Sequence, residues 1–236
     1  MTLDDLQTLI GKLTNDPNHD RYSLVDINTE LDNSQDIWNL DAKVLKDSVT
    51  ITVVDGTRQY ALSGLTGTPI AFPRTTHKGI DLIKRSKAYF DHLTNYDWTQ
   101  DTGTPTDFFI EAEDPDNQFI TLHPTPQSGD AGAYLVVEYV KRQTSMSLST
   151  DVPFMSGTTS NYLLRPFDMG LAYSVAAKLL MRDPTQENAL KSTNYATIAK
   201  NVLAEVIQVF NALEAEEPKR ISGGRYWAGG NVRQLK

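Results

Sequence analysis

The chain has 236 residues, 39% of them hydrophobic, and a net charge of −8. This length and composition are ordinary for a soluble protein with one sizeable core or two small ones. We expect no membrane span, because no apolar run reaches roughly 18–20 residues. We expect no secretion signal, because the N-terminus lacks the positively charged segment with which such a signal begins. The absence of cysteine excludes disulfides and thiolate metal sites. The acidic balance also argues against a general nucleic-acid binder.

The apolar residues of the first 46 positions recur with helical spacing. This spacing predicts one helix from Thr2 to Leu13 and a second from Ser23 to about Lys46. In each, the first residue and the aspartate three positions later have the spacing of a capping box. The apolar positions are Leu3, Leu6, Ile10 and Leu13 in the first helix, and Leu24, Ile27, Leu31, Trp38 and Leu45 in the second.

The pattern changes to strands after these helices. The β-branched run Val49–Val54 and the segment Gln59–Leu62 flank Asp55–Gly56, which predicts a hairpin. Residues 63–79 are rich in glycine, threonine and proline and are expected to form a loop. Ile80–Ile83 is expected to be a short strand.

The next elements are less regular until a clear alternating strand. Ser86–Leu93 fits one or two helical turns, and Gln100–Pro105 is expected to be a loop. Phe108–Ala112 and Phe119–Leu122 are expected to pair as a second hairpin, and Tyr134–Val140 is the alternating strand. Residues 141–160 are expected to be irregular, with apolar anchors at Met146, Leu148 and Phe154.

Two C-terminal helices, at about 166–182 and 184–216, give the strongest helical signal in the chain. We expect Asp183 to cap the second one and Pro184 to occupy its first position. Each helix has an apolar face that needs a partner, either within the chain or on a neighbouring copy. These bundle-core or subunit-interface candidates are Leu171, Val175, Leu179, Tyr195, Ile198, Val202, Val206, Phe210 and Leu213.

The order of elements predicts an α+β fold. We expect residues 1–47 and 161–217 to form one α-helical bundle and residues 48–160 to form an antiparallel β-domain inserted between its second and third helices. Residues 218–236 are expected to be a flexible basic tail that holds no acid, whereas the rest holds 17 basic and 30 acidic residues. The tail candidates for partner binding are Lys219, Arg220, Arg225, Tyr226, Trp227, Arg233 and Lys236.

No pattern of catalytic or metal-binding residues is present. His19, His77, His92 and His123 lack metal-ligand spacing and are expected in loops or at the surface. The acidic run from Glu111 to Asp116 lacks the glycine of a calcium loop. We therefore expect no enzyme activity, no metal and no cofactor.

Tyr89, Phe90, Tyr96 and Trp98 form an aromatic cluster with two interpretations. It is either part of the β-domain core, which we favour because aromatics are mostly buried, or a contact patch for a glycan or a protein. The tail is likewise either a solvated terminus or a segment that orders on an acidic partner surface, with Tyr226 and Trp227 as anchors.

From residue 107 onward the order of elements resembles a known family. The runs Phe119–Pro126, Tyr134–Tyr139, Asp151–Phe154 and Tyr162–Leu164 lead into an alanine-rich helix. Asp183-Pro-Thr and the long helix that ends at Pro218 follow it. This arrangement resembles the head-to-tail adaptor (connector) proteins of tailed bacteriophages.

The resemblance implies a virion structural protein at the head–tail interface, made in the cytoplasm of the bacterial host. Such adaptors assemble as a dodecameric ring that binds the portal protein, extends the DNA channel and offers a docking surface for a tail tube, nozzle or tail-hub protein. Genomic DNA would pass through without sequence-specific binding. The C-terminal tail would reach onto the portal. Two alternatives stay open, a virion binding module whose β-domain contacts a glycan or another structural protein, and an enzyme of unrecognised type.

Overall fold

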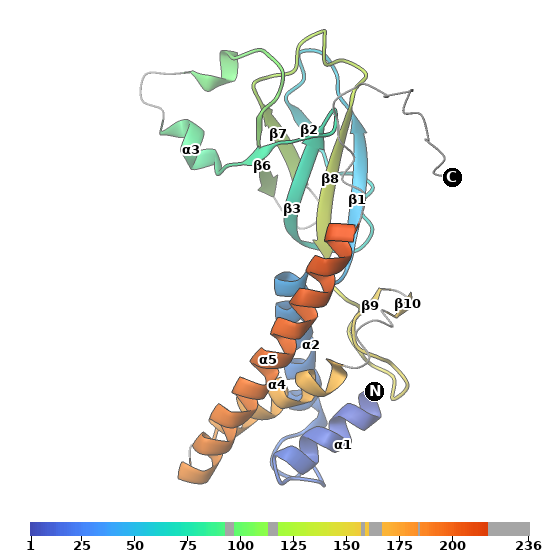
Figure 1. The fold of residues 1–236 in the computed structure, drawn as a ribbon, viewed down its shortest axis with the longest axis vertical. Helices are drawn as coiled ribbons and strands as arrows, with labels where there is room; N and C mark the ends of the chain where they lie inside the picture. Colours follow the sequence, from blue (N-terminus) through green and yellow to red (C-terminus); the bar gives the residue numbers. More distant parts are fainter. Residues whose placement is uncertain (93–96, 113–117, 157–158, 161–166, 184, 217–236) are drawn as a thin grey trace, which may run out of the picture.

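The computed structural model describes residues 1–92, 97–112, 118–156, 159–160, 167–183 and 185–216 (Figure 1). The molecule is elongated, with the four longer helices at one end and two β-sheets at the other (Figure 1). Helices from both ends of the chain pack together, and the strands lie between them in sequence. The predicted α+β fold with an inserted antiparallel β-region is therefore confirmed.

The two N-terminal helices begin where their caps were predicted. Helix α1 spans Leu3–Leu13, and Thr2 and Asp5 form a complete capping box. Helix α2 spans Leu24–Ala42, and the Ser23 hydroxyl accepts the backbone N–H of Asp26. This helix ends earlier than predicted, because Lys43 adopts a left-handed conformation with φ of 51°.

A buried carboxylate holds the loop between these helices. The Asp16 carboxylate accepts the backbone N–H groups of Asp20, Arg21 and Tyr22 at 2.8–3.0 Å. Burial alone would raise the Asp16 pKa, but these three donors outweigh it and lower the pKa below its ordinary value of 3.8. The loop is therefore held by hydrogen bonds to a charged group.

The first sheet pairs strands that are distant in sequence. Its order is β1 (Lys46–Thr52), β8 (Tyr134–Lys141), β3 (Pro69–His77) and β4 (Ile80–Asp81), all antiparallel. The prediction of a loop over 63–79 was wrong, since β3 is a nine-residue strand despite Pro69 and Pro73. Two register shifts in β3 accommodate these prolines.

The second sheet has the order β2 (Gln59–Ala61), β7 (Gln118–His123), β6 (Asp107–Ala112) and β5 (Ile83–Lys84). The predicted hairpin of β6 and β7 is confirmed. The predicted hairpin around Asp55–Gly56 was wrong, because β1 pairs with β8 and β2 with β7 in different sheets. Between the named strands of the described residues, all pairings are antiparallel except the short parallel contact of β5 with β6.

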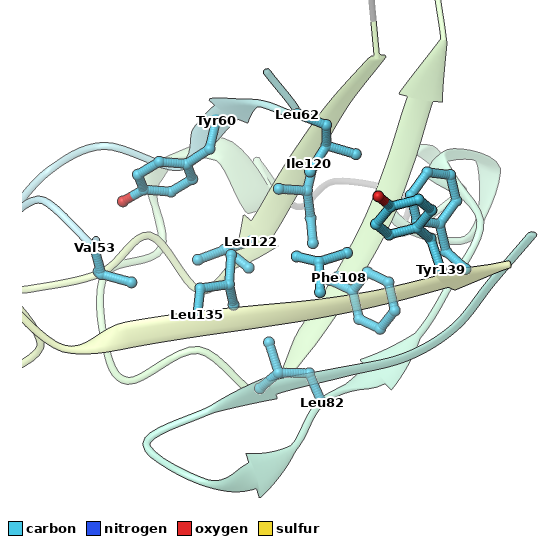
Figure 2. Close-up of a cluster of buried hydrophobic side chains, with 11 residues drawn as sticks. Val53, Tyr60, Leu62, Leu82, Phe108, Ile120, Leu122, Leu135 and Tyr139 are labelled. Atoms are coloured by element: carbon cyan, nitrogen blue, oxygen red, sulfur yellow. The ribbon is translucent and has the colours of Figure 1, made fainter. Parts of the chain in front are cut away.

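The two sheets face each other across one apolar core (Figure 2). Leu135, Val137 and Tyr139 alternate along β8 and point into this core, as the spacing of a half-buried strand requires. Phe108, Ile120 and Leu122 meet them from the second sheet. The β-region is therefore a two-layer sandwich.

Short elements connect the strands and the later helices. Ser86 caps α3 (Lys87–Asp91), and a 3₁₀ turn, η1, covers Trp98–Gln100. Helix α3 lies in an excursion at the side of the sheets (Figure 1). The two-residue strands β9 (Met155–Ser156) and β10 (Thr159–Ser160) pair with each other in the predicted irregular segment.

The segment after β8 returns to the helices and is tied to α2 by side-chain amides. The Asn39 amide donates to the Lys141 carbonyl at 2.7 Å and accepts the Leu45 N–H at 2.9 Å, so it joins both passages between helices and sheets. Met146 and Phe154 are buried among the helices, as predicted. Leu148 is 64% exposed, so its assignment as an apolar anchor was wrong.

The two C-terminal helices are α4 (Asp168–Met181) and α5 (Gln186–Glu216). The predicted capping of α5 by Asp183 was wrong, because the Thr185 hydroxyl accepts the Asn188 N–H at 3.2 Å. Pro184 lies outside the described residues. Helix α4 packs against α1, α2 and α5, and Leu171, Val175 and Leu179 are fully buried.

One glycine sets the distance between three helices. A Cβ atom at Gly170 would lie 2.5 Å from Cη2 of Trp38 on α2 and 2.6 Å from Cγ1 of Val202 on α5. Such distances are too short for carbon atoms, so α2, α4 and α5 cross this closely only because residue 170 has no side chain.

Gly170→Ala should therefore lower the free energy of unfolding by about 1–3 kcal/mol, the usual cost of overpacking a core. Val202→Ala in the same chain should recover part of this loss, because it removes one of the two clashing groups. Chemical denaturation gives these values, with Gly129→Ala as the control because no atom lies near its added Cβ. An unchanged Gly170→Ala protein would contradict the argument.

Asp16→Asn should weaken the fold at neutral pH by about 1 kcal/mol and flatten its acid dependence, because an amide cannot replace the carboxylate as acceptor for three N–H groups. The folded pKa lies below 3.8, so the contribution of Asp16 is full above that pH and is lost as the pH falls through the folded value. Urea unfolding between pH 7 and pH 3 tests this. The exposed Asp55→Asn is the control, and a parallel loss in both variants would refute the assignment.

Candidate partner-binding surfaces

The residues predicted to bind a partner through the C-terminal tail all lie outside the described residues. This holds for Lys219, Arg220, Arg225, Tyr226, Trp227, Arg233 and Lys236. Their role stays a prediction from sequence, and the described surfaces are those of the helices and the sheets.

The helical candidates fall into three groups by burial. Leu171, Val175, Leu179 and Val206 are buried within the chain. Tyr195, Val202 and Phe210 are half-buried, whereas Ile198 is exposed on α5. Leu213 lies in α5, but its side chain is not among those described. Helix α4 is thus completed by its own chain, whereas α5 keeps a long outer face open.

Among the residues that the structure describes, no strand pairs with the outer edge of β1. Lys141 N–H donates to the Leu45 carbonyl and Val53 N–H to the Ala133 carbonyl, so odd-numbered residues of this segment pair with β8. The backbone groups of Ser48, Thr50 and Thr52 therefore point away from the sheet, and the Ser48 N–H donates to the Asp47 carboxylate at 2.8 Å. Their side chains are exposed and uncharged.

The other sheet edges are short or interrupted. Strand β2 has three residues, and β4 and β5 have two each. Pro69, Pro73 and two register shifts interrupt β3 beyond its contact with β4. These are the usual means by which proteins prevent the addition of a strand, and β1 lacks both proline and register shifts. The sequence did not reveal this edge, because it placed β1 in a local hairpin.

The aromatic cluster is centred on Phe90, which is 1% exposed. Its ring lies 5.3 Å from Trp98, 5.5 Å from Phe109 and 4.8 Å from His123. The cluster therefore anchors the α3 excursion to the second sheet, which agrees with the core interpretation for Phe90, whereas Tyr89 is 46% exposed. Tyr96 lies outside the described residues.

Two cations cover the outer aromatic rings of this cluster. The Arg58 guanidinium lies 5.0 Å from the Trp98 ring centroid, and the Arg85 guanidinium lies 4.6 Å from that of Tyr89. The exposed part of the Trp98 face is thus already in use, which weakens the glycan alternative.

The expectation that all histidines lie in loops or at the surface was wrong for His123, the half-buried last residue of β7, and for His77. His77 lies in β3 with 2% exposure, and its Nε2 is 3.3 Å from the Asp130 carboxylate. Lys78 and Thr104 donate to the same Asp130 oxygen at 2.7 and 3.3 Å. Burial would raise the Asp130 pKa, but the Lys78 ammonium and His77 hold it below its ordinary value. The cluster fixes the 127–133 turn to β3.

Glu111 shows that part of the acidic run is structural. Its carboxylate accepts from Lys87 at 2.7 Å, Gln59 at 3.1 Å and Thr121 at 3.2 Å. Glu113, Asp114 and Asp116 lie outside the described residues. Within the described ranges, no three His, Asp or Glu side chains are grouped as metal ligands.

Over the part of the chain that the structure describes, no helix combines the length and apolarity needed to cross a membrane.

Comparison with known proteins gives one clear result. The family model of the SU10 adaptor protein matches residues 1–221, which covers both helical segments, the β-sandwich and the first residues of the tail. No curated protein sequence matches the chain. The family is a structural one and not a known enzyme family. The chain therefore belongs to the SU10 adaptor protein family and is a bacteriophage adaptor protein.

Proposed function

We propose that this chain forms the adaptor ring between the portal protein and the tail of a phage particle. The family match over residues 1–221 carries the proposal. In this proposal, the chain assembles as a homo-oligomeric ring, extends the DNA channel below the portal and docks a tail tube, nozzle or tail-hub protein. Twelve copies are the number that the resemblance implies.

The C-terminal tail is the proposed portal contact. Five basic residues after Pro218 carry a net charge of +5, against −13 for the rest of the chain. Such a segment is attracted to an acidic surface, and Tyr226 and Trp227 offer large contact areas at low entropic cost. Arg225 and both aromatics lie beyond residue 221, so they would give specificity for this phage's own portal.

The acidic body suits a channel through which DNA slides. A protein surface holds DNA mainly through cations that neutralise phosphates, and most of this chain has an excess of acids. The DNA would therefore pass without sequence-specific binding. Electron microscopy of the chain with its portal tests the whole proposal, and a persistent monomer that never associates with the portal would refute it.

A second candidate function uses the sandwich, in which β1 accepts a strand from another virion protein. Its regular edge favours this candidate, because strand addition uses outward backbone groups such as those of Thr50 and Thr52. The two candidates are compatible when the tail-side partner supplies the strand.

Deleting residues 219–236 should leave the fold intact, because the described core clusters are built from residues 1–210. Portal affinity should fall at least tenfold. Thermal unfolding and titration of portal with the truncated chain measure both. Replacing the five basic residues by Gln removes the charge of the tail and keeps its aromatic side chains. The double variant Tyr226→Ala with Trp227→Ala removes the aromatic side chains and keeps the charge. Comparing the two shows which of them the portal contact depends on. Undiminished portal affinity, or loss of folding, would contradict the assignment.

Thr50→Pro should block strand addition at β1 and abolish binding of the tail-side protein, while the sandwich stays folded. The Thr50 N–H faces away from β8, so proline removes no bond of the existing ladder. Thr50→Val keeps the N–H and is the control. Co-sedimentation with the tail-side protein measures binding, and equal binding of both variants would exclude this edge as the docking site.

A further inference from the structure

The outer face of α5 carries a row of uncharged, exposed side chains. Successive members are four and three residues apart, and the row lies opposite the buried Ser192, Ala199 and Val206. A helix face in contact with water normally carries charged residues, and this row carries none. A spacing of alternately four and three residues is also the spacing that keeps one line of side chains against a partner helix. The row consists of Leu190, Asn194, Thr197, Asn201, Ala204 and Gln208.

The polar groups of this face are partly satisfied within the helix. The hydroxyls of Thr193 and Thr197 donate to carbonyls four residues earlier, each at 2.9 Å. Their methyl groups are therefore free for outward contact. Leu190 is 67% exposed and Ile198, beside the row, is 38% exposed. Depletion of charge marks the buried centre of a protein interface.

Helix α2 has a similar outer row opposite its own buried face. Val25 is 75% exposed. The Thr29 hydroxyl donates to the backbone carbonyl of Val25 at 2.8 Å. The row consists of Val25, Thr29, Asn33, Ile37 and Leu40, all of them exposed and uncharged.

Three acids beside the α2 row are paired with arginines of the same chain. Arg182 pairs with Asp26 at 3.0 Å and with Glu30 at 2.6 Å. Arg142 pairs with Asp36 at 3.2 Å. At these three positions a partner helix would therefore meet paired charges.

The two rows lie on opposite sides of the helical end. The inner faces of α2 and α5 meet in one core cluster, where Trp38 packs with Val202 and Val206. In Figure 1, α5 passes in front of α2, so the outer face of one helix points toward the viewer and that of the other away.

We propose that the α5 row of one copy packs against the α2 row of the next copy. The inference rests on the proposed ring function and names the surfaces that close the ring. A contact between two different faces of one chain is heterologous, and its repetition generates a closed ring when the rotation between copies is right.

Charge and length favour a second copy as the occupant. Copies with a net charge of −8 repel one another except where their surfaces are neutral, and both rows are neutral. At 1.5 Å per residue the rows are about 27 Å and about 22 Å long. The exposed Lys200 and Glu205 flank the α5 row, and the exposed Asp41 lies at the end of the α2 row; none of the three has an ion-pair partner among the described residues. Lys200 and Asp41 complement each other in charge across the contact.

Cysteine cross-linking tests the contact directly, because the chain has no native cysteine. Double variants combine Thr29→Cys or Asn33→Cys with Thr197→Cys or Asn201→Cys, four pairs that sample the register. Oxidation should give a ladder of multimers on a non-reducing gel from at least one pair. The test uses the chain alone and its complex with the portal.

The controls separate the possible failures. Each single-cysteine variant, and the exposed pair Thr8→Cys with Ser128→Cys, should give no ladder. A ring seen by mass measurement without a ladder from any of the four pairs would overturn the inference and leave the proposed function standing. Absence of both ring and portal binding would overturn both. Dimers from a single variant would show a two-fold contact and also overturn the inference.

A charge placed in the row gives an independent readout. Asn201→Glu should weaken ring association at least tenfold while thermal unfolding stays unchanged, because the side chain is exposed in the free chain. Ala196→Glu puts the same charge on an exposed position outside the row and should leave the ring intact. Equal association of the two variants would refute the proposed interface.

Discussion

The close crossing of three helices at Gly170 is the constraint on which the rest of the helical end depends. With no side chain at this position, Trp38 of α2 and Val202 of α5 approach the backbone of α4 directly. Because α4 is then surrounded by its own chain, its burial stabilises the monomer. The same crossing orients α2 and α5 with their inner faces together, which leaves both outer rows for other molecules.

The sequence predicted the elements whose signals are local. Thr2, Asp5 and Ser23 mark helix starts through hydrogen bonds within one turn, and the apolar spacing of α4 and α5 follows from a single period. The β6–β7 hairpin was likewise a contact between neighbours in sequence. The pairing of β1 with β8 was not predictable in this way, because it joins segments about 90 residues apart and depends on the completed core.

The candidate surfaces were predictable only where they depend on composition. The basic tail was visible as a charge count, and the neutral face of α5 is visible as spacing once the buried side of the helix is known. The open edge of β1 required the strand order, and the burial of His77 required the turn that carries Asp130. A local motif cannot report such contacts, since each partner comes from a distant part of the chain. Pro69 and Pro73 misled the prediction for β3, because proline is compatible with an edge that is interrupted by register shifts.

The two ends of the molecule offer different kinds of candidate contact surface, and this difference suits an adaptor. The helical end offers neutral side-chain rows on opposite sides, which favour contacts between identical copies. The sandwich protects most of its edges and leaves β1 open, which favours a contact with one extended segment. Asn39 binds both passages between the ends, which ties the sandwich to α2. A ring built through the helices would therefore present its β1 edges at fixed spacing, which is what a symmetric docking surface requires.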